Sequence, residues 1–378
     1  MKIAVLFANY GPYHIARLSA ASRLSQTSSQ SIIGIELARQ ENEYPWHTTT
    51  DELPFKLYSV VTGQPLETIS NRKLCVQLWR LLHELSPDVV AIAGYSRPAM
   101  LTALLWCRQQ GKPAILMSET TEYDFTRKPI REFIKRLIVQ QFSSALVGGK
   151  PHTRYLIKLG MASEKIFPGY DVVDNSVFHP DKIKLLSEPL STPYFLSINR
   201  FVRKKNLPLL ITAYGQYLQQ ARKNAWDLVL CGDGELRPQI EILIKQYQLE
   251  NHVHLPGFLQ QEELLPYFAH AQCFIHASTT EQWGLVVNEA MAAGLPVLVS
   301  NRCGCFEDLV LERINGFGFD PENQQQLTNL MLKMSSGEVD LDAMGQASLK
   351  HIQKYSPDYF AQGLKQAIDC ALSQRSPK

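Results

Sequence analysis

The sequence predicts an α/β protein of two domains, each built on a parallel β-sheet covered by helices. Short runs rich in Val, Ile and Leu alternate with segments whose apolar residues recur at helical spacing, which is typical of strands buried on both faces of a sheet. The alternation stops near the middle of the chain and then restarts. A chain of 378 residues suits two domains of about 180 residues each better than a single core.

Six runs in the first half have the composition of buried strands. They are KIAVLFAN (2–9), SIIGIELA (31–38), KLYSVV (56–61), DVVAIAG (88–94), PAILMSE (113–119) and SALVGG (144–149). Most are separated by segments with apolar residues at i, i+3 and i+4, such as Leu74, Leu78, Leu81, Leu82 and Leu85. That spacing places the leucines on one face of a helix, so strands and helices alternate.

The stretch 180–193 is polar, contains several prolines and has no clear period, so we interpret it as a linker. This places the first domain at residues 1–185 and the second at 193–355. In the second domain the predicted strands are YFLSINR (194–200), DLVLCGDG (227–234), HVHLPG (252–257), CFIHAS (273–278) and LPVLVS (295–300). Helices are predicted near 207–222, 236–248 and 262–269, and an amphipathic helix is predicted near 357–372.

The composition excludes several classes of protein. With 45% hydrophobic and 20% charged residues the chain is typical of a globular protein. A formal charge of +2, without an arginine-rich arm or zinc-ligand spacing, argues against a nucleic-acid partner. Seven cysteines without a CxxC pair predict reduced thiols and a cytoplasmic protein. No run reaches the roughly 18 apolar residues that a membrane span needs.

The most informative segment is EQWGLVVNEAMAAGLPVLVSN, residues 281–301. A strand leads into a helix beside Gly284, so the first amides of that helix are available to phosphate. Glu289 lies one turn further on, and an ionised carboxylate accepts two hydroxyl hydrogen bonds, which suits a diol. A diphosphate beside a diol describes a nucleotide.

This segment resembles the donor half of the retaining GT-B glycosyltransferases of family four, also called glycosyl transferases group 1. The resemblance rests on the E-x7-E pattern from Glu281 to Glu289, the run EAMAAGLPV that begins at Glu289, and Asn315-Gly316-Phe317. Residues 199–206 are similar to the family's G-R-x-x-x-x-K-G segment. The resemblance implies two Rossmann-like domains facing a central cleft, with residues 356–378 crossing back to the first domain.

In such a fold the donor would be held mainly by the second domain. The resemblance assigns the ribose to Glu289 and the hydroxyls of the transferred sugar to Glu281. It assigns the diphosphate to the 284–286 amides and two cations, namely Gly284, Leu285, Val286, Arg200 and Lys205. Gly257 and Phe258 match the loop that holds the base. No metal and no cofactor besides the nucleotide sugar are expected, because two cations already oppose the charge of the leaving group.

The first domain would supply the remaining contacts. Gly11 follows the first strand, where relatives bring glycines against the donor phosphate. Glu119 follows the fifth strand, where many relatives have a histidine that contacts the sugar. Glu119 is either its substitute or an ordinary loop residue. His276, at the end of the strand before Glu281, is assigned no role.

The resemblance implies transfer of a sugar from a nucleotide-diphosphate sugar to a hydroxyl acceptor, with retention of configuration. The acceptor would be a glycan, a lipid-linked molecule or a small molecule. One alternative is a catalytically silent subunit that binds nucleotide sugars, and another is a GT-B epimerase or phosphorylase. A Rossmann dehydrogenase is excluded, because no GxGxxG follows the first strand.

Residues 127–142, RKPIREFIKRLIVQQF, form a basic amphipathic segment. Ile130, Phe133, Ile134 and Leu137 lie on one side of a helical wheel, and Lys128, Arg131 and Lys135 on the other. We expect the apolar side to pack on the sheet of the first domain. The basic side is then either solvated or in contact with anionic lipid headgroups, which would place the protein at the inner face of a membrane.

Overall fold

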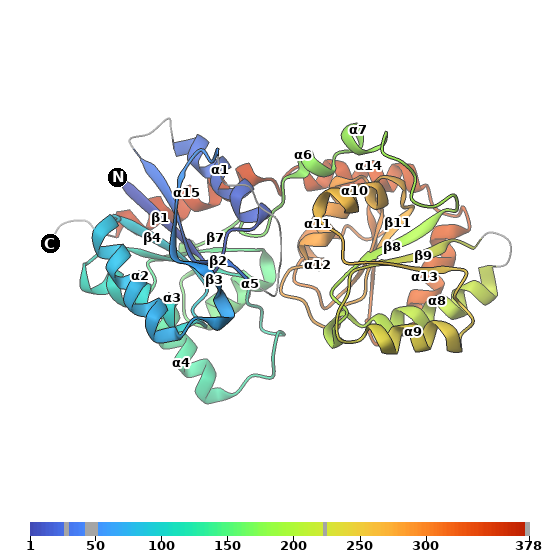
Figure 1. Ribbon diagram of the computed structural model, residues 1–378, viewed down its shortest axis with the longest axis horizontal. Coiled ribbons are helices and arrows are strands. Elements are labelled where there is room, and N and C mark those ends of the chain that lie inside the picture. The colour runs from blue at the N-terminus through green and yellow to red at the C-terminus, as the bar shows by residue number, and fades with distance from the viewer. Residues whose placement is uncertain (26–29, 42–51, 222–224, 375–378) are drawn as a thin grey trace. The chain divides into compact units, whose positions relative to one another are not determined.

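The computed structural model describes residues 1–25, 30–41, 52–221 and 225–374 and divides the chain into two compact units (Figure 1). Unit 1 comprises Met1–Asp174 and Tyr355–Lys378, and unit 2 comprises Asn175–Lys354. The boundary predicted at residue 185 therefore lies too late. The reason is local packing: Phe178 is buried against Phe268 of unit 2, with ring centroids 5.4 Å apart, and Ile183 is also buried.

Unit 1 is built on a parallel sheet with the strand order β3-β2-β1-β4-β5-β6-β7. The strands are β1 (Lys2–Phe7), β2 (Ser31–Gln40), β3 (Lys56–Pro65), β4 (Val89–Ala93), β5 (Ala114–Ser118), β6 (Ser144–Val147) and β7 (Ile166–Pro168). The six predicted strands are all present. The sequence analysis missed β7, which has only three residues.

Helices cover both faces of this sheet. They are α1 (Pro12–Ser25), α2 (Asn71–Leu85), α3 (Pro98–Gln109), α4 (Pro129–Val139), α5 (Lys150–Lys158) and α15 (Pro357–Ser373). Alternate residues of β1 serve different faces: Ala4 and Leu6 share a core with α2 and α3, whereas Ile3 and Val5 share one with α1 and α15. Period-two side-chain alternation thus explains why every residue from Ile3 to Phe7 is apolar.

The C-terminal helix α15 belongs to unit 1, the domain onto which the sequence analysis folded it. It packs beside α1 and against β6 and β7. The Ser144 hydroxyl donates to the Ala367 carbonyl at 2.7 Å. Gly363 permits the close packing, because a Cβ there would lie 2.2 Å from the Pro168 carbonyl oxygen.

Unit 2 has the strand order β10-β9-β8-β11-β12-β13, again parallel. Its strands are β8 (Tyr194–Ile198), β9 (Asp227–Cys231), β10 (Val253–Gly257), β11 (Cys273–His276), β12 (Val297–Ser300) and β13 (Gly316–Phe319). The short glycine-containing β13 was not predicted as a strand. The α/β class with two parallel sheets is confirmed.

The helices of unit 2 connect these strands. They are α6 (Asn175–Phe178), α7 (Pro180–Ile183), α8 (Leu207–Ala221), α9 (Arg237–Gln246), α10 (Gln261–His270), α11 (Leu285–Ala292), α12 (Phe306–Leu309), α13 (Gln324–Ser335) and α14 (Leu341–Ile352). From β8 the sheet grows through β9 to β10, and the chain then returns to place β11 on the other side of β8. The strand order reverses between β8 and β11, which is where open α/β sheets bind ligands. None of the described helices is long and apolar enough to span a membrane.

The first prediction concerns Gly363. An alanine would favour the helix by about 1 kcal/mol, but its Cβ would collide with the Pro168 carbonyl, and overpacking costs about 1–3 kcal/mol or more. We expect Gly363→Ala to lower the free energy of unfolding in urea. Gly215→Ala in α8 is the control, because its Cβ would meet Tyr247 at an ordinary 3.4 Å. A Gly363→Ala variant at least as stable as the native chain would refute this packing argument.

Candidate functional site

The loops that follow β8 and β11 bring three charged side chains together at the strand-order reversal of unit 2. Lys204 and Lys205 lie in the short helical turn after β8, and Glu281 lies in the loop between β11 and α11. The Lys204 ammonium is 3.1 Å from Glu281 Oε1, and the Lys205 ammonium pairs with Glu281 Oε2. Residues about 76 positions apart in the chain thus form one charged cluster.

Glu281 is held in its ionised form although it is largely enclosed. Burial alone would raise the pKa of its carboxyl, but the nearby His276 ring and the charges of Lys205 and Lys204 outweigh burial and hold the pKa well below its usual value. The Ser278 hydroxyl adds a contact at 3.4 Å. The cluster therefore keeps a fixed negative charge between two cations.

His276 is the site residue that the sequence analysis missed. Its side chain is fully buried at the end of β11, with Nε2 at 3.8 Å from Glu281 Oε2 and 3.3 Å from the Ser278 hydroxyl. Burial lowers the pKa of His276, so the ring is neutral near neutral pH. The signal was a histidine in a strand whose neighbours are all apolar.

The structure pairs two residues that the resemblance assigned to different parts of the donor. Lys205 was expected at the diphosphate and Glu281 at the sugar, yet each side chain is only 11% exposed and their charged atoms are in contact. Arg200 lies half-buried a few residues earlier, after β8. The paired lysine and carboxylate therefore act as one unit in this structure.

The helix α11 begins next to this cluster. Its N-cap Gly284 has φ 105°, a backbone conformation that favours glycine, and a Cβ there would lie 3.3 Å from His276 Nε2. The amides of Leu285 and Val286 lie in the first helical turn, where no intrahelical acceptor exists. Glu289 is one turn further along and is only 4% exposed.

Neighbouring loops hold the start of α11 in place. The indole of Trp283 donates to the Asn288 side-chain oxygen at 2.8 Å, and both side chains are buried. The Gly304 amide donates to the Glu281 carbonyl at 2.9 Å, and the Cys305 amide donates to the Trp283 carbonyl at 3.2 Å. The loop after β12 thus fixes the backbone on which Glu281 stands.

The turn after β9 supports the loop after β8. Gly232 has φ 128°, and a Cβ on it would lie 1.8 Å from the Asn199 carbonyl oxygen, so only glycine allows this approach. The Gly232 amide donates to the Gly257 carbonyl at 2.7 Å. The Gly257 carbonyl, predicted to serve the base, is thus bonded within the protein, while the adjacent Phe258 ring is exposed.

In unit 1, the Gly11 amide is bonded within its own loop. It donates to His14 Nδ1 at 3.2 Å. Burial, helped by the charge of Arg17, lowers the pKa of His14 to about 3, so the neutral ring can accept this bond. The Gly11 amide, expected to approach a phosphate, is satisfied by its own loop.

Glu119 follows β5 and is linked to a buried acid. Its charge lies near Asp171, whose pKa is raised by burial and by this nearby charge. The buried Arg17 lies 4.0 Å from Asp171 and donates to the Val172 carbonyl at 3.0 Å. Sequence reasoning did not connect these residues, because they come from three distant segments.

The described part of the chain contains no group of three or more His, Cys, Asp or Glu side chains that could hold a metal ion. His252 and His254 instead flank Asp227, each with a ring nitrogen 3.0 Å from one of its carboxylate oxygens. His254 lies on β10, His252 just before it and Asp227 at the start of β9, away from the carboxyl ends of the strands where Glu281 stands.

The comparisons with known proteins agree with this geometry. Residues 180–351, nearly the whole of unit 2, match the family described as glycosyl transferases group 1. Unit 2 is thus similar over nearly its whole length to the glycosyl transferases group 1. The family resemblance noted in the sequence is thereby confirmed.

Curated relatives of the chain include glycosyltransferases named for polysaccharide biosynthesis. The amylovoran biosynthesis glycosyltransferase AmsK of Erwinia amylovora is 32% identical over 194 residues, which are 49% of this chain and 46% of that protein. The putative colanic acid biosynthesis glycosyltransferase WcaL of Escherichia coli is 28% identical over 57% of this chain and 53% of that protein. The matches therefore span about half the length of these relatives.

Solved structures extend the similarity to both units. The sucrose-phosphate synthase of Thermosynechococcus elongatus superposes with a TM-score of 0.78 at 17% identity, covering 99% of each chain. The Anabaena protein HepE, solved with UDP and glucose, superposes with a TM-score of 0.75 at 19% identity, covering 98% of this chain and 99% of that one. At such identities the likeness shows the fold, and the GT-B fold is confirmed.

The second prediction tests the charge cluster. Glu281→Gln leaves Lys204 and Lys205 opposed to a neutral amide, and breaking a buried pair costs about 3 kcal/mol of unfolding free energy. The pKa of Glu281 is lower in the folded chain than in the unfolded chain, so the ionised carboxylate stabilises the fold at pH values above the pKa of the unfolded state. This stabilisation is lost progressively as the pH falls below about 4. Urea unfolding should show a large difference from the native chain at pH 7 and a smaller one at pH 3.

The exposed pair Arg237–Glu241 in α9 supplies the control, since Glu241→Gln should change stability by less than about 1 kcal/mol. If Glu281→Gln is no more costly than Glu241→Gln at pH 7, the cluster does not stabilise unit 2.

Proposed function

We propose that this chain transfers a sugar from a nucleotide-diphosphate sugar to a hydroxyl acceptor, with retention of configuration. One observation carries the proposal: the start of α11 and the Lys204–Lys205–Glu281 cluster lie together at the strand-order reversal of unit 2, within the segment matched by the family. Helix amides and cations are suited to a diphosphate leaving group, whose charge grows as the glycosidic bond breaks.

Each donor group has a proposed partner in unit 2. The Leu285 and Val286 amides would bind the diphosphate, and Arg200 would oppose the charge that develops on it. Glu289 would accept hydrogen bonds from the ribose diol. Glu281, kept ionised by its two lysines and His276, would accept hydrogen bonds from hydroxyls of the transferred sugar.

The acceptor is proposed to be a glycan or a lipid-linked glycan intermediate. Support comes from the relatives AmsK and WcaL, whose names refer to biosynthesis of amylovoran and colanic acid. Glu119 would meet the sugar or the acceptor from unit 1, because it stands half-buried at the carboxyl end of β5.

No metal is assigned to the reaction, because the cations at this site already suit the leaving group. We also propose that the transfer takes place at an anionic membrane surface, since α4 and the residue before it carry the exposed basic side chains Lys128, Arg131 and Arg136.

The third prediction tests donor binding. Glu289→Ala should weaken the binding of UDP or another nucleoside diphosphate by about 2–4 kcal/mol, because two charge-assisted hydrogen bonds are lost. Isothermal titration calorimetry measures the affinity, and thermal unfolding verifies that the variant is folded. Glu241→Ala in α9 is the matched control. Unchanged nucleotide affinity in a folded Glu289→Ala variant would rule out the diol role.

The fourth prediction separates turnover from binding. Arg200→Ala should slow nucleotide release from a sugar donor by about 100-fold and weaken ground-state binding much less, since the opposing charge grows in the transition state. Arg203→Ala, at an exposed neighbouring position, should change little.

Glu119→Gln should slow transfer without changing nucleotide affinity. Equal losses of rate and affinity in Arg200→Ala, or a native transfer rate in Glu119→Gln, would refute the respective role.

A further inference from the structure

The helix α4 turns its apolar side outward. Ile130, Phe133, Ile134 and Leu137 are 76%, 61%, 51% and 47% exposed. The prediction that this side packs on the sheet of unit 1 is therefore wrong. Figure 1 shows α4 extending from the lower edge of unit 1, with one end pointing away from the sheet.

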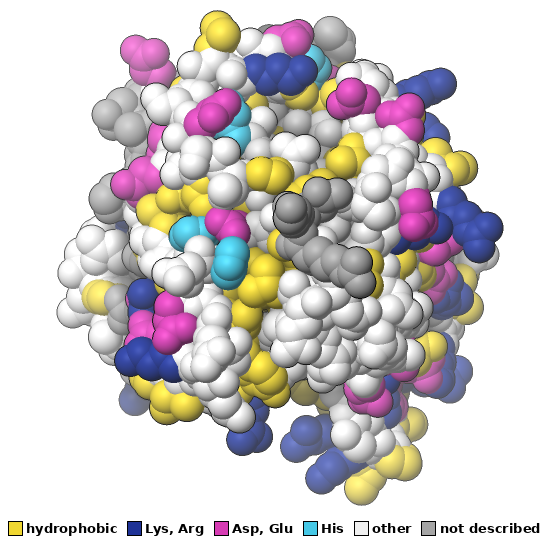
Figure 2. All heavy atoms as spheres, turned by 90° about the vertical axis from the view of Figure 1, so that its right-hand side faces the viewer, with side chains coloured by type: hydrophobic (Ala, Val, Ile, Leu, Met, Phe, Trp, Pro, Cys, Tyr) yellow, Lys and Arg dark blue, Asp and Glu magenta, His cyan; other side chains and the backbone are white. Residues whose placement is uncertain are grey.

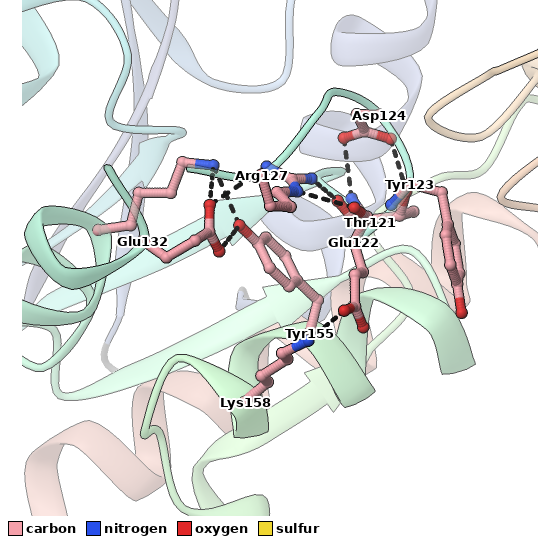
Figure 3. A network of polar contacts seen from close by, with 9 residues as sticks. Thr121, Glu122, Tyr123, Asp124, Arg127, Glu132, Tyr155 and Lys158 are labelled. Atoms are coloured by element: carbon pink, nitrogen blue, oxygen red, sulfur yellow. Dashed lines mark hydrogen bonds and ion pairs between the residues drawn. The ribbon is translucent and has the colours of Figure 1, made fainter. Parts of the chain in front are cut away.

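A polar network attaches the opposite side of α4 to the rest of unit 1 (Figure 3). The Tyr155 hydroxyl of α5 donates to Glu132 Oε2 at 2.7 Å, and the Lys135 ammonium donates to Glu132 Oε1 at 3.0 Å. The Arg127 guanidinium lies over the Tyr155 ring, 4.6 Å from its centroid. Charged side chains thus take the inward position that apolar residues normally occupy in an amphipathic helix.

The same network shapes the loop that leads from β5 to α4. Arg127 Nε donates to the Glu122 carbonyl at 2.7 Å, and Glu122 pairs with Lys158 of α5. Asp124 accepts hydrogen bonds from the Thr121 amide at 2.9 Å and from its hydroxyl at 2.5 Å. The loop conformation is therefore well supported by described contacts.

This supported loop exposes two aromatic residues. Tyr123 is 72% exposed and Phe125 is 74% exposed, and Figure 3 shows the Tyr123 ring directed away from the network. Together with the outward face of α4, six large apolar side chains within residues 123–137 are in contact with solvent. Concentrated exposure of this kind marks an interaction surface, whereas isolated exposed apolar residues do not.

Basic residues border the apolar stripe. On the helical wheel Arg131 and Arg136 lie on opposite sides of Ile130, Phe133 and Leu137, and both are exposed, as is Lys128. Figure 2 shows dark blue and yellow side chains next to one another along its lower edge. An apolar stripe bordered by cations complements a bilayer of anionic lipids, which offers hydrocarbon beneath a layer of phosphates.

We propose that α4 and residues 121–128 form an interfacial surface that inserts its apolar side chains into an anionic bilayer. Lys128, Arg131 and Arg136 would contact lipid phosphates. This differs from a purely electrostatic attachment, because the exposed apolar side chains supply binding that salt does not screen.

The position of the surface deepens the proposed function, on which this step rests. The loop starts at the carboxyl end of β5, so only one residue separates Glu119 from the network residue Thr121. A bilayer bound by this surface would bring lipid-linked molecules to the acceptor-side residue Glu119. The acceptor class is therefore a hydroxyl on a glycan carried by a lipid.

The fifth prediction is made for vesicle binding, which needs no donor or acceptor. The native chain should sediment with vesicles of phosphatidylglycerol and phosphatidylcholine, and part of this binding should persist at high salt. Replacing Ile130, Phe133, Ile134 and Leu137 together by Gln should weaken binding at least tenfold at either salt concentration, on the order of the loss expected for four interfacial apolar side chains. Gln preserves helix propensity, and the exposed positions favour normal folding.

The matched control replaces two exposed apolar residues of other helices, Leu105→Gln and Ile242→Gln, and should bind vesicles like the native chain. A charge variant with Lys128, Arg131 and Arg136 changed to Gln should lose binding at low salt while retaining the salt-resistant part.

Native vesicle binding by the fourfold Gln variant would overturn the proposal. A second outcome would also overturn it. If the native chain does not bind vesicles but forms a dimer in analytical ultracentrifugation, and the fourfold Gln variant does not form that dimer, the surface joins two copies of the chain. Nucleotide affinity, measured by calorimetry, tests the donor site separately. A failure of the proposed function is therefore distinguishable from a failure of vesicle binding.

Discussion

The geometry of unit 2 around the start of α11 depends on one enclosed charge, the carboxylate of Glu281. A carboxylate removed from water is unstable unless cations and hydrogen bonds compensate it, and here Lys204, Lys205 and His276 do so. The compensation joins the segment after β8 to the segment after β11. Because the Glu281 backbone is also bonded to the loop after β12, a single charge ties together three loops at the carboxyl edge of the sheet.

The two units share a sheet topology but use the corresponding edge differently. In unit 2 the reversal point gathers cations around a carboxylate beside a helix start. In unit 1 the equivalent loop after β1 is closed on itself, because the Gly11 amide is bonded to His14, and the polar groups lie further along the sheet at Glu119, Asp171 and Arg17. The groups proposed to bind phosphate therefore lie in unit 2, and in the proposed function unit 1 meets the acceptor.

The sequence predicted the fold well because buried parallel strands leave continuous apolar runs. It missed β7 and β13, which are too short for such a run, and it set the unit boundary too late, because Phe178 and Ile183 are buried within a polar stretch. At the site it found Lys205 and Glu281, but neither Lys204 nor the pairing of these residues. Lys205 contacts Glu281, and His276 lies beside Glu281, only because the loops after β8 and β11 come together in the folded chain. No local sequence pattern predicts that approach.

The orientation of α4 shows a limit of amphipathic patterns. A helical wheel separates an apolar from a polar side, but it does not say which side meets the protein. In α4 the orientation of the helix is determined by Glu132, whose carboxylate accepts hydrogen bonds from Tyr155 of α5 and from Lys135. Turning the helix over would leave this carboxylate without its tyrosine and place Arg131 and Arg136 nearer the sheet, where unpaired charges are costly. The outward apolar side is thus a consequence of specific polar contacts and is available to a lipid surface.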